Sequence, residues 1–161
     1  MVEVRQATAA DQATITAMIR RARINPMGLK WPYFVVAVDG DAVVGVAQVK
    51  VHKRGTRELA SVATAPDRQG EGIASRLIGE LLAREAGTVY LYCEQKLVPF
   101  YERFAFREVA DSEIAGDLMG NVRLGRFFTR VGSVVMREPI RLAVMRRDAA
   151  EASTESSVTG G

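Results

Sequence analysis

The chain has very little cysteine and histidine: among its 161 residues there is one of each, Cys93 and His52. A single cysteine cannot form a disulfide within the chain, which favours a reducing compartment such as the cytoplasm. One cysteine and one histidine are also too few for a zinc site of the usual sulfur and nitrogen type. We therefore expect a cytoplasmic protein without disulfides. We expect no bound metal either, since no spacing of carboxylates suggests one.

Long apolar runs are missing as well. No stretch approaches the roughly 18 apolar residues of a membrane-spanning helix, and residues 1–20 contain Glu3 and Asp11 where a signal peptide would have an apolar core. Hydrophobic residues make up 48% and charged residues 25% of the chain, as in an ordinary globular protein. We expect no membrane span, a single domain over residues 1–147 and a disordered tail over 148–161, which lacks apolar periodicity.

Excess basic charge is confined to one segment. Residues 119–147 carry seven arginines and one glutamate, whereas acidic and basic side chains balance over residues 1–118. Proteins that bind nucleic acids generally spread their cations over a wider surface, so we expect no nucleic-acid partner. We interpret the arginines as the solvated face of a helix; attraction of an acidic substrate, a lid, a dimer contact and a membrane-surface element are the alternatives. Arginine outnumbers lysine 18 to 4, which we take to indicate a bacterial gene.

The order of the predicted elements indicates a mixed sheet. Hairpin signals come early in the chain, and a strand–helix–strand unit lies in the middle, so the sheet is expected to be neither purely parallel nor purely antiparallel. Apolar residues recur at strand or helix spacing along most of the chain. The predicted strands cover residues 2–7, 33–38, 42–52, 57–64, 88–93, 106–109 and 140–145, and the predicted helices cover residues 8–23, 71–86, 98–104 and 116–131.

The most informative stretch joins the strand over residues 57–64 to the helix over 71–86. Gly70 and Gly72 let a phosphate approach the backbone, and the free amides and positive dipole end of a helix start bind anions. A P-loop would need a lysine after the second glycine, and a dinucleotide-binding loop would need a glycine where Ser75 stands. We therefore predict a diphosphate site that is neither a P-loop nor a dinucleotide-binding loop.

Three stretches resemble the GNAT superfamily of N-acetyltransferases. Residues Gln69 to Ala74 are similar to its signature [Q/R]-x-x-G-x-[G/A], and residues 100–106 are similar to its F-Y-x-x-x-G-F element, with Ala105 in the usual glycine place. Residues 58–63 resemble the corresponding strand of members of the N-acetylglutamate synthase type. The resemblance covers about residues 2–110 and the final strand.

This resemblance implies an α/β (α+β) fold with a mixed, mostly antiparallel sheet, flanked by helices, whose central parallel strands, here 57–64 and 88–93, splay apart. It implies that acetyl-CoA binds in the splay, and that its acetyl group passes directly to a primary amine of a small molecule or a protein in a ternary complex. The alternative is a catalytically silent regulator that binds acyl-CoA. The implied cofactor contacts are Val62, Ala63, Thr64, Arg68, Gln69, Gly70, Glu71, Gly72, Ile73, Ala74 and Ser75.

The resemblance also implies catalytic and acceptor residues. Tyr101 protonates the departing sulfur, and Glu58 is a candidate general base, with Glu94 or a water chain as alternatives. Without a catalytic role, Tyr101 would be a packed aromatic ring, and Glu58 and Glu94 would be solvated charges at strand ends. We expect His52 at the surface and Cys93 packed in its strand. The oligomeric state is expected to be a monomer or a homodimer. The candidate contacts of the acceptor amine are Asn25, Trp31, Tyr33 and Glu94.

Overall fold

A computed structural model describes residues 1–125 and 141–149. Residues 126–140 and 150–161 lie outside the described part, and with them the end of the predicted helix over 116–131, much of the arginine-rich segment and most of the predicted tail. The described residues group into two compact units. The first holds Met1–Lys50 and Leu59–Glu85, and the second holds Val51–Glu58 and the described residues from Ala86 onward.

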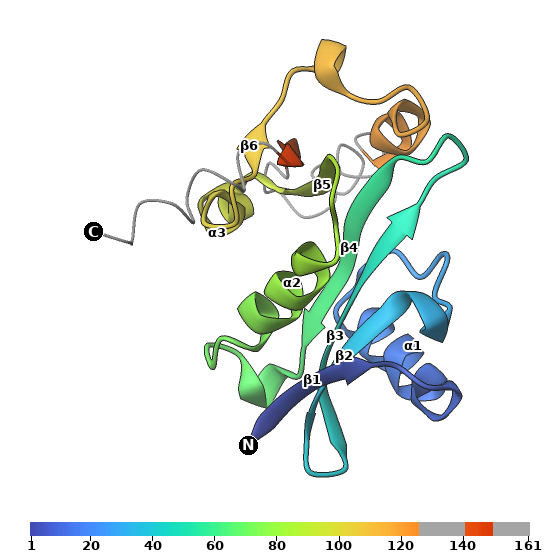
Figure 1. Ribbon diagram of the computed structural model, residues 1–161, viewed down its shortest axis with the longest axis vertical. Coiled ribbons are helices and arrows are strands. Elements are labelled where there is room, and N and C mark those ends of the chain that lie inside the picture. Colours follow the sequence, from blue (N-terminus) through green and yellow to red (C-terminus); the bar gives the residue numbers. More distant parts are fainter. Residues whose placement is uncertain (126–140, 150–161) are drawn as a thin grey trace, which may run out of the picture. The chain divides into compact units, whose positions relative to one another are not determined.

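The first unit is built on a sheet with helices packed on it (Figure 1). Its strands are β1 (Val2–Gln6), β2 (Phe34–Asp39), β3 (Ala42–Val51) and most of β4 (Arg57–Thr64). β1 pairs antiparallel with β2, and β2 pairs antiparallel with β3. Two helices complete the unit: α1 (Gln12–Arg21) and α2 (Ile73–Ala83), of which α2 packs on β1 and β2.

The chain enters α1 through a capping box. The carboxylate of Asp11 accepts hydrogen bonds from the backbone N–H of Thr8 at 2.7 Å and from its hydroxyl at 2.9 Å, which confirms the motif expected from the sequence. The same carboxylate accepts two bonds from the Arg5 guanidinium at 2.8 and 3.0 Å. These donors, the Arg5 bond first among them, hold the pKa of Asp11 well below its usual range.

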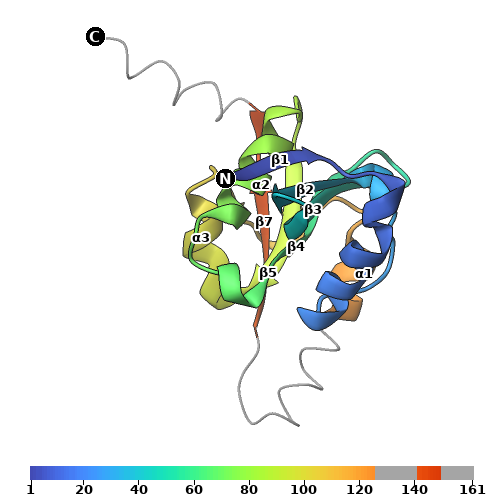
Figure 2. The same ribbon diagram turned by 90° about the horizontal axis from the view of Figure 1, so that it is seen from below.

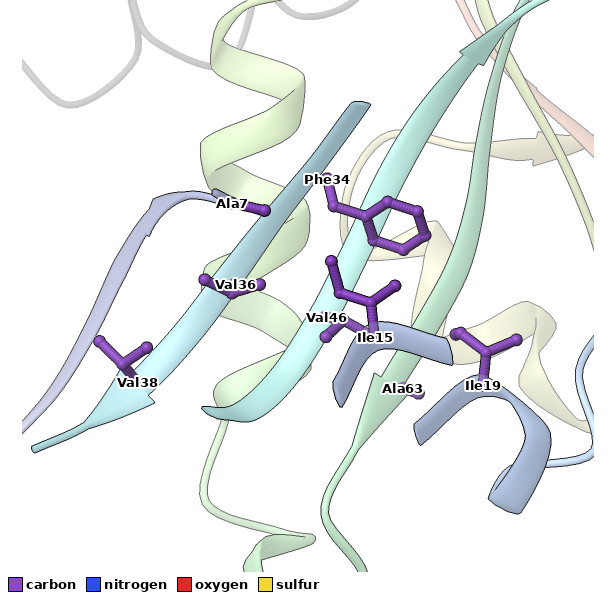
Figure 3. Packing of buried hydrophobic residues seen from close by; sticks show 8 residues of the cluster. All are labelled: Ala7, Ile15, Ile19, Phe34, Val36, Val38, Val46 and Ala63. Carbon is purple, nitrogen blue, oxygen red and sulfur yellow. The ribbon is translucent and has the colours of Figure 1, made fainter. Parts of the chain in front are cut away.

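Side chains of β2 alternate between the two helices. Phe34, Val36 and Val38 face α1, whereas Ala37 lies on the opposite face, towards α2. Figure 3 shows the first cluster, with α1 in front of the strands and α2, in green, behind them. Each face of the sheet is thus closed by one helix. The cluster on the α1 side consists of Ala7, Ile15, Ile19, Phe34, Val36, Val38, Val46 and Ala63.

The second unit combines the start of β4 with the strands of the later chain. β5 (Val89–Glu94) pairs antiparallel with β7 (Leu142–Arg147), beside which it runs in Figure 2, and β7 pairs with the short β6 (Arg107–Glu108). The first two residues of β4 pair with β5 in parallel, Arg57 with Val89 and Glu58 with Tyr90. Helix α3 (Val98–Glu102) belongs to this unit. Its core is formed by Tyr90, Val109, Ile114, Leu118, Val122 and Val144.

The hydrogen-bonded strand order, β1-β2-β3-β4-β5-β7-β6, confirms the predicted fold class: a mixed, mostly antiparallel sheet with its parallel pair, β4 and β5, away from the edges. The observed ends differ from the predicted ones by a few residues. α2 begins at Ile73 because Gly72 has a left-handed φ of 78°, and residues 119–125 form the described part of the late helix. Asp148 accepts a hydrogen bond from the Thr88 hydroxyl at 3.0 Å, and the domain boundary expected after residue 147 stays a prediction.

Candidate functional site

The loop between β4 and α2 presents free backbone amides. Gly70 and Gly72 have φ angles of 85° and 78°, and a Cβ added at either would meet no described atom within 4 Å. Because the N-cap of α2 is Gly72, no cap side chain competes for the N–H groups of the first turn. The dipole of an eleven-residue helix adds positive potential at the same end. Open space, free donors and positive potential together fit a diphosphate.

Arg68, an expected cofactor contact, is held by two carboxylates. Its Nε lies 2.8 and 2.9 Å from the two oxygens of Glu71, and its Nη1 lies 3.0 Å from Oδ2 of Asp39, at the end of β2. These bonds, the one to Glu71 first, raise the pKa of Arg68, and Arg68 in turn lowers the pKa of Glu71. The positive charge of Arg68 is therefore largely matched within the protein, which leaves the backbone amides as the main donors of the loop.

An irregularity interrupts β4 at Ser61, whose φ of 56° is left-handed. Non-glycine residues rarely adopt this conformation, and inside a strand it interrupts the regular alternation of side chains. The Ser61 hydroxyl accepts a hydrogen bond of 2.9 Å from Nε2 of Gln48, and both side chains are buried. No glycine or proline marks this position, so the sequence did not predict the irregularity. It directly precedes Val62, one of the expected backbone contacts of the cofactor.

The expected contacts on β4 differ in burial. Val62 and Thr64 are half-buried, whereas Ala63 is 7% exposed and belongs to the core cluster beneath α1. Ile73 is also buried, against the sheet. Ala63 and Ile73 therefore offer a ligand their backbone but not their side chains.

Glu58, the candidate base, is buried and paired, not solvated. Its side chain is 6% exposed, and its Oε2 lies 2.6 Å from Nε2 of His52, whose side chain is 14% exposed. The expected surface position of His52 is thus wrong: the turn between β3 and β4 folds the imidazole back onto the first paired residues of β4. A third group joins them, since burial, the charge of Glu58 and a hydrogen bond to it raise the pKa of Tyr92.

Tyr101, the candidate acid, lies on α3 among aromatic rings. Its ring centroid is 5.0 Å from that of Phe100 and 6.3 Å from that of Phe106, both in edge-on arrangements. Burial, with a smaller contribution from Cys93, raises the pKa of Tyr101 to about 12, so the phenol keeps its proton at neutral pH. Ala105, in the usual glycine place of the motif, has a left-handed φ of 61°. This conformation explains why a glycine is usual there.

Cys93 is a buried thiol of β5, as expected. Burial first, and then the charges of Glu108 and Glu94, raise its pKa to about 11. A thiol that keeps its proton at neutral pH is a poor nucleophile, which argues against a covalent route through Cys93.

The expected acceptor contacts lie in different environments. Asn25 accepts a hydrogen bond from the backbone of Met27 at 3.0 Å, Trp31 is half-buried against the core cluster, and Tyr33 is 52% exposed. All three belong to the segment between α1 and β2, in the first unit. Glu94 belongs to the second unit, where it is exposed and lies 2.6 Å from Nζ of Lys96. A common acceptor site for these residues stays a prediction.

Comparisons with known proteins agree with this geometry. A family model described as an acetyltransferase (GNAT) domain matches residues 30–108. Residues 30–108 of this chain are a GNAT acetyltransferase domain. Domains of this family use acetyl-CoA, and their fold supports an acyltransferase that depends on acyl-CoA. No curated protein matches the sequence.

Several solved GNAT structures share the fold. N-acetylglutamate synthase from Neisseria gonorrhoeae, complexed with coenzyme A and N-acetyl-glutamate, has a TM-score of 0.73 at 16% identity over 92% of this chain and 35% of its own. Rv2747 from Mycobacterium tuberculosis, in complex with CoA and NLQ, has a TM-score of 0.68 at 21% identity over 91% of this chain and 98% of its own. The ribosomal-protein-S18-alanine N-acetyltransferase from Escherichia coli has a TM-score of 0.63 at 15% identity over 92% of this chain and 94% of its own. The chain spans about a third of the Neisseria synthase.

Two further properties concern the described residues of this GNAT chain. Over residues 1–125 and 141–149, no helix is long and apolar enough to cross a membrane. Over the same ranges, no three histidine, cysteine, aspartate or glutamate side chains are grouped so as to hold a metal ion.

Proposed function

We propose that this chain is an N-acetyltransferase, which moves the acetyl group of acetyl-CoA to a primary amine by direct attack in a ternary complex. Acetyl-CoA supplies the chemistry of a thioester, whose carbonyl carbon an amine attacks. The protein has to bind the diphosphate, orient the thioester, take a proton from the amine and give one to the sulfur. Each of these tasks has a candidate group among the described residues.

The loop from Gln69 to Ala74 carries the proposal. Its two left-handed glycines open onto free space, and the amides of the first turn of α2 are directed at an anion there. This arrangement fits the diphosphate of coenzyme A in the absence of a P-loop lysine. We assign the half-buried stretch from Val62 to Thr64 to the pantetheine arm, along which its backbone groups would bind like an added strand.

Three groups are assigned to the chemistry. A backbone N–H near Val62, next to the left-handed Ser61, would donate to the thioester oxygen as its negative charge grows. Tyr101 would protonate the sulfur, since its raised pKa keeps the phenol protonated. Glu58 would take the proton of the ammonium group, because a buried carboxylate that accepts a bond from His52 still has lone pairs to offer.

The acceptor is proposed to be a primary amine of a small molecule or of a protein. Among the structural neighbours, one is named an N-acetylglutamate synthase and another a ribosomal-protein-alanine acetyltransferase, so both kinds of acceptor occur on this fold. We assign its binding to the segment with Asn25, Trp31 and Tyr33. We place the enzyme in the cytoplasm, where its single buried cysteine stays reduced.

Calorimetry of acetyl-CoA binding tests the diphosphate site. We expect Gly72→Val to weaken binding at least about tenfold, because a side chain there meets both a left-handed backbone and the incoming phosphates. Gly55→Ala is the matched control: it places a side chain at another left-handed glycine with open space around it, in the turn between β3 and β4. Wild-type binding by Gly72→Val would overturn the proposed site, as would an equal loss in both variants.

Release of the coenzyme A thiol tests the reaction. The wild-type protein is incubated with acetyl-CoA and a panel of amines that includes free glutamate, free glutamine and a peptide beginning with alanine. An acetyltransferase releases thiol with at least one amine and much less without any. Tight acetyl-CoA binding without release on a broad panel would instead identify a silent acyl-CoA-binding regulator.

A further inference from the structure

His52 and Glu58 lie on opposite sides of a turn, and the backbone of each is held by hydrogen bonds or strand pairing. The N–H of His52 donates to the carbonyl of Thr56 at 2.9 Å, and the N–H of Gly55 donates back to the carbonyl of His52 at 2.9 Å. These two bonds close the turn and fix the backbone from which the imidazole projects. Glu58 is fixed as well, because it is paired with Tyr90 in the sheet.

A carboxylate outside the pair strengthens the turn. Asp117 accepts hydrogen bonds from the backbone N–H of Arg54 at 3.2 Å and from the hydroxyl of Thr56 at 2.5 Å. The hydrogen bond from Thr56 is the first cause of the lowered pKa of Asp117, and the charge of His52 contributes to it. The turn and Asp117 thus fix the backbone of His52, and the sheet fixes that of Glu58.

The pair is short and shielded from water. Its two atoms are 2.6 Å apart, and the side chains are 14% and 6% exposed. Such a distance requires a proton between Nε2 and Oε2, since two lone pairs would repel each other. With an ionised carboxylate, that proton is on Nε2. Tyr92 is a further titratable group near the carboxylate, since burial first and then the charge of Glu58 raise its pKa.

We infer that His52 is the positioning residue of the candidate base: its Nε2–H donates to Oε2 of Glu58 and holds the carboxylate in place while a remaining lone pair takes the proton of the acceptor ammonium. This inference rests on the proposed function. Two protons leave the nitrogen. The ammonium loses the first to Glu58, from which it passes to water. The attacking nitrogen loses the second as the amide forms, and this proton replaces the one that Tyr101 gives to the sulfur. His52 keeps its own proton throughout.

The position of the proton can be measured without any acceptor, because His52 is the only histidine of the chain. In the untagged full chain labelled with ¹⁵N-histidine, we expect one ring, with the neutral form carrying its proton on Nε2. In Glu58→Gln this preference should weaken, since an amide accepts less strongly than a carboxylate. A wild-type ring protonated on Nδ1 would overturn the inference, whether or not the protein turns out to be an acetyltransferase.

Steady-state kinetics then test whether His52 positions Glu58 or only packs against it. The acceptor is any amine of the panel that is acetylated. We expect His52→Leu to lower kcat at least about tenfold while KM for acetyl-CoA stays within about twofold. On the acid side, the rate of this variant should fall off at a higher pH than that of wild type, because a carboxylate that loses a donor is protonated more readily. His52→Gln keeps an N–H donor and should recover part of both losses.

Thr88→Val is the matched control, since it removes another polar contact at a strand end of the same unit, the 3.0 Å bond to Asp148. Its kcat and pH profile should equal those of wild type. Circular dichroism and acetyl-CoA affinity check that each variant is folded. An unchanged pH profile in a folded His52→Leu variant would refute the inference, as would equal losses in His52→Leu and His52→Gln.

Discussion

The contact between β3 and α2 allows one stability prediction to be worked from distances. A Cβ added to Gly45 would lie 2.6 Å from Cγ2 of Ile73 and 2.9 Å from Cδ1 of Leu77. Carbon atoms in contact are normally about 3.5–4.0 Å apart, so both side chains would have to retreat by about 1 Å. Ile73 is 2% and Leu77 0% exposed, which leaves them little room to do so.

We therefore expect Gly45→Ala to destabilise the protein by about 1–3 kcal/mol, the usual range for overpacking in a core. For a chain of this size, that corresponds to a melting temperature lower by about 2–12 °C in a thermal unfolding experiment. Ile73 is also the first residue of α2, next to Gly72. Its displacement should move the amides of the loop and weaken acetyl-CoA binding in the same variant.

Gly79→Ala makes the same chemical change in the middle of α2, where a Cβ meets no described atom within 4 Å. Alanine is favoured over glycine in a helix by about 0.5–1 kcal/mol, so this variant should melt higher than wild type by about 1–4 °C. The melting temperature is thus expected to fall in Gly45→Ala and to rise in Gly79→Ala. If Gly45→Ala melted at or above the wild-type temperature, the close packing of α2 on β3 would be refuted.

Three further predictions concern single residues. Ala105→Gly should stabilise the protein by about 1 kcal/mol in denaturant unfolding, because a left-handed φ of 61° strains alanine but not glycine; an equal or lower stability would contradict the strain. Tyr101→Phe should lower turnover by about 10²–10⁴-fold and leave acetyl-CoA affinity unchanged in calorimetry; equal turnover would remove the proposed acid. Because the folded pKa of Asp11 is depressed, its contribution is present at neutral pH and is lost as the pH falls below about 4. Asp11→Asn should therefore be clearly less stable than wild type at pH 7 and closer to it at pH 3, in unfolding measured at each pH; a difference that does not depend on pH would contradict this.

The sequence predicted those features whose cause lies within a few neighbouring residues. The capping box of Thr8 and Asp11 is one such feature, because both partners are three positions apart and bond to each other locally. The loop with Gly70 and Gly72 is another, since two glycines just before an amphipathic helix are typical of a tight turn that leads into it. The mixed character of the sheet also followed, because hairpin and crossover signals are encoded in the connections.

Features that depend on pairing across strands could not be predicted. His52 meets Glu58 because the turn between them closes on a particular pair of backbone bonds, which composition does not reveal. The left-handed Ser61 has no glycine to mark it and is held by Gln48 from the neighbouring strand. The ion pairs of Arg68 likewise depend on the end of β2, 29 residues earlier in the chain at Asp39.

The pairing of Arg68 has a consequence for how salt affects the site. Between Ala65 and Ser75 it is the only cationic side chain, and it is already neutralised by Asp39 and Glu71. Main-chain dipoles carry no counterions that a ligand could displace, unlike clusters of free lysine or arginine. Coenzyme A held in this way should lose little affinity when ionic strength rises, which would let the protein bind it across a wide range of salt.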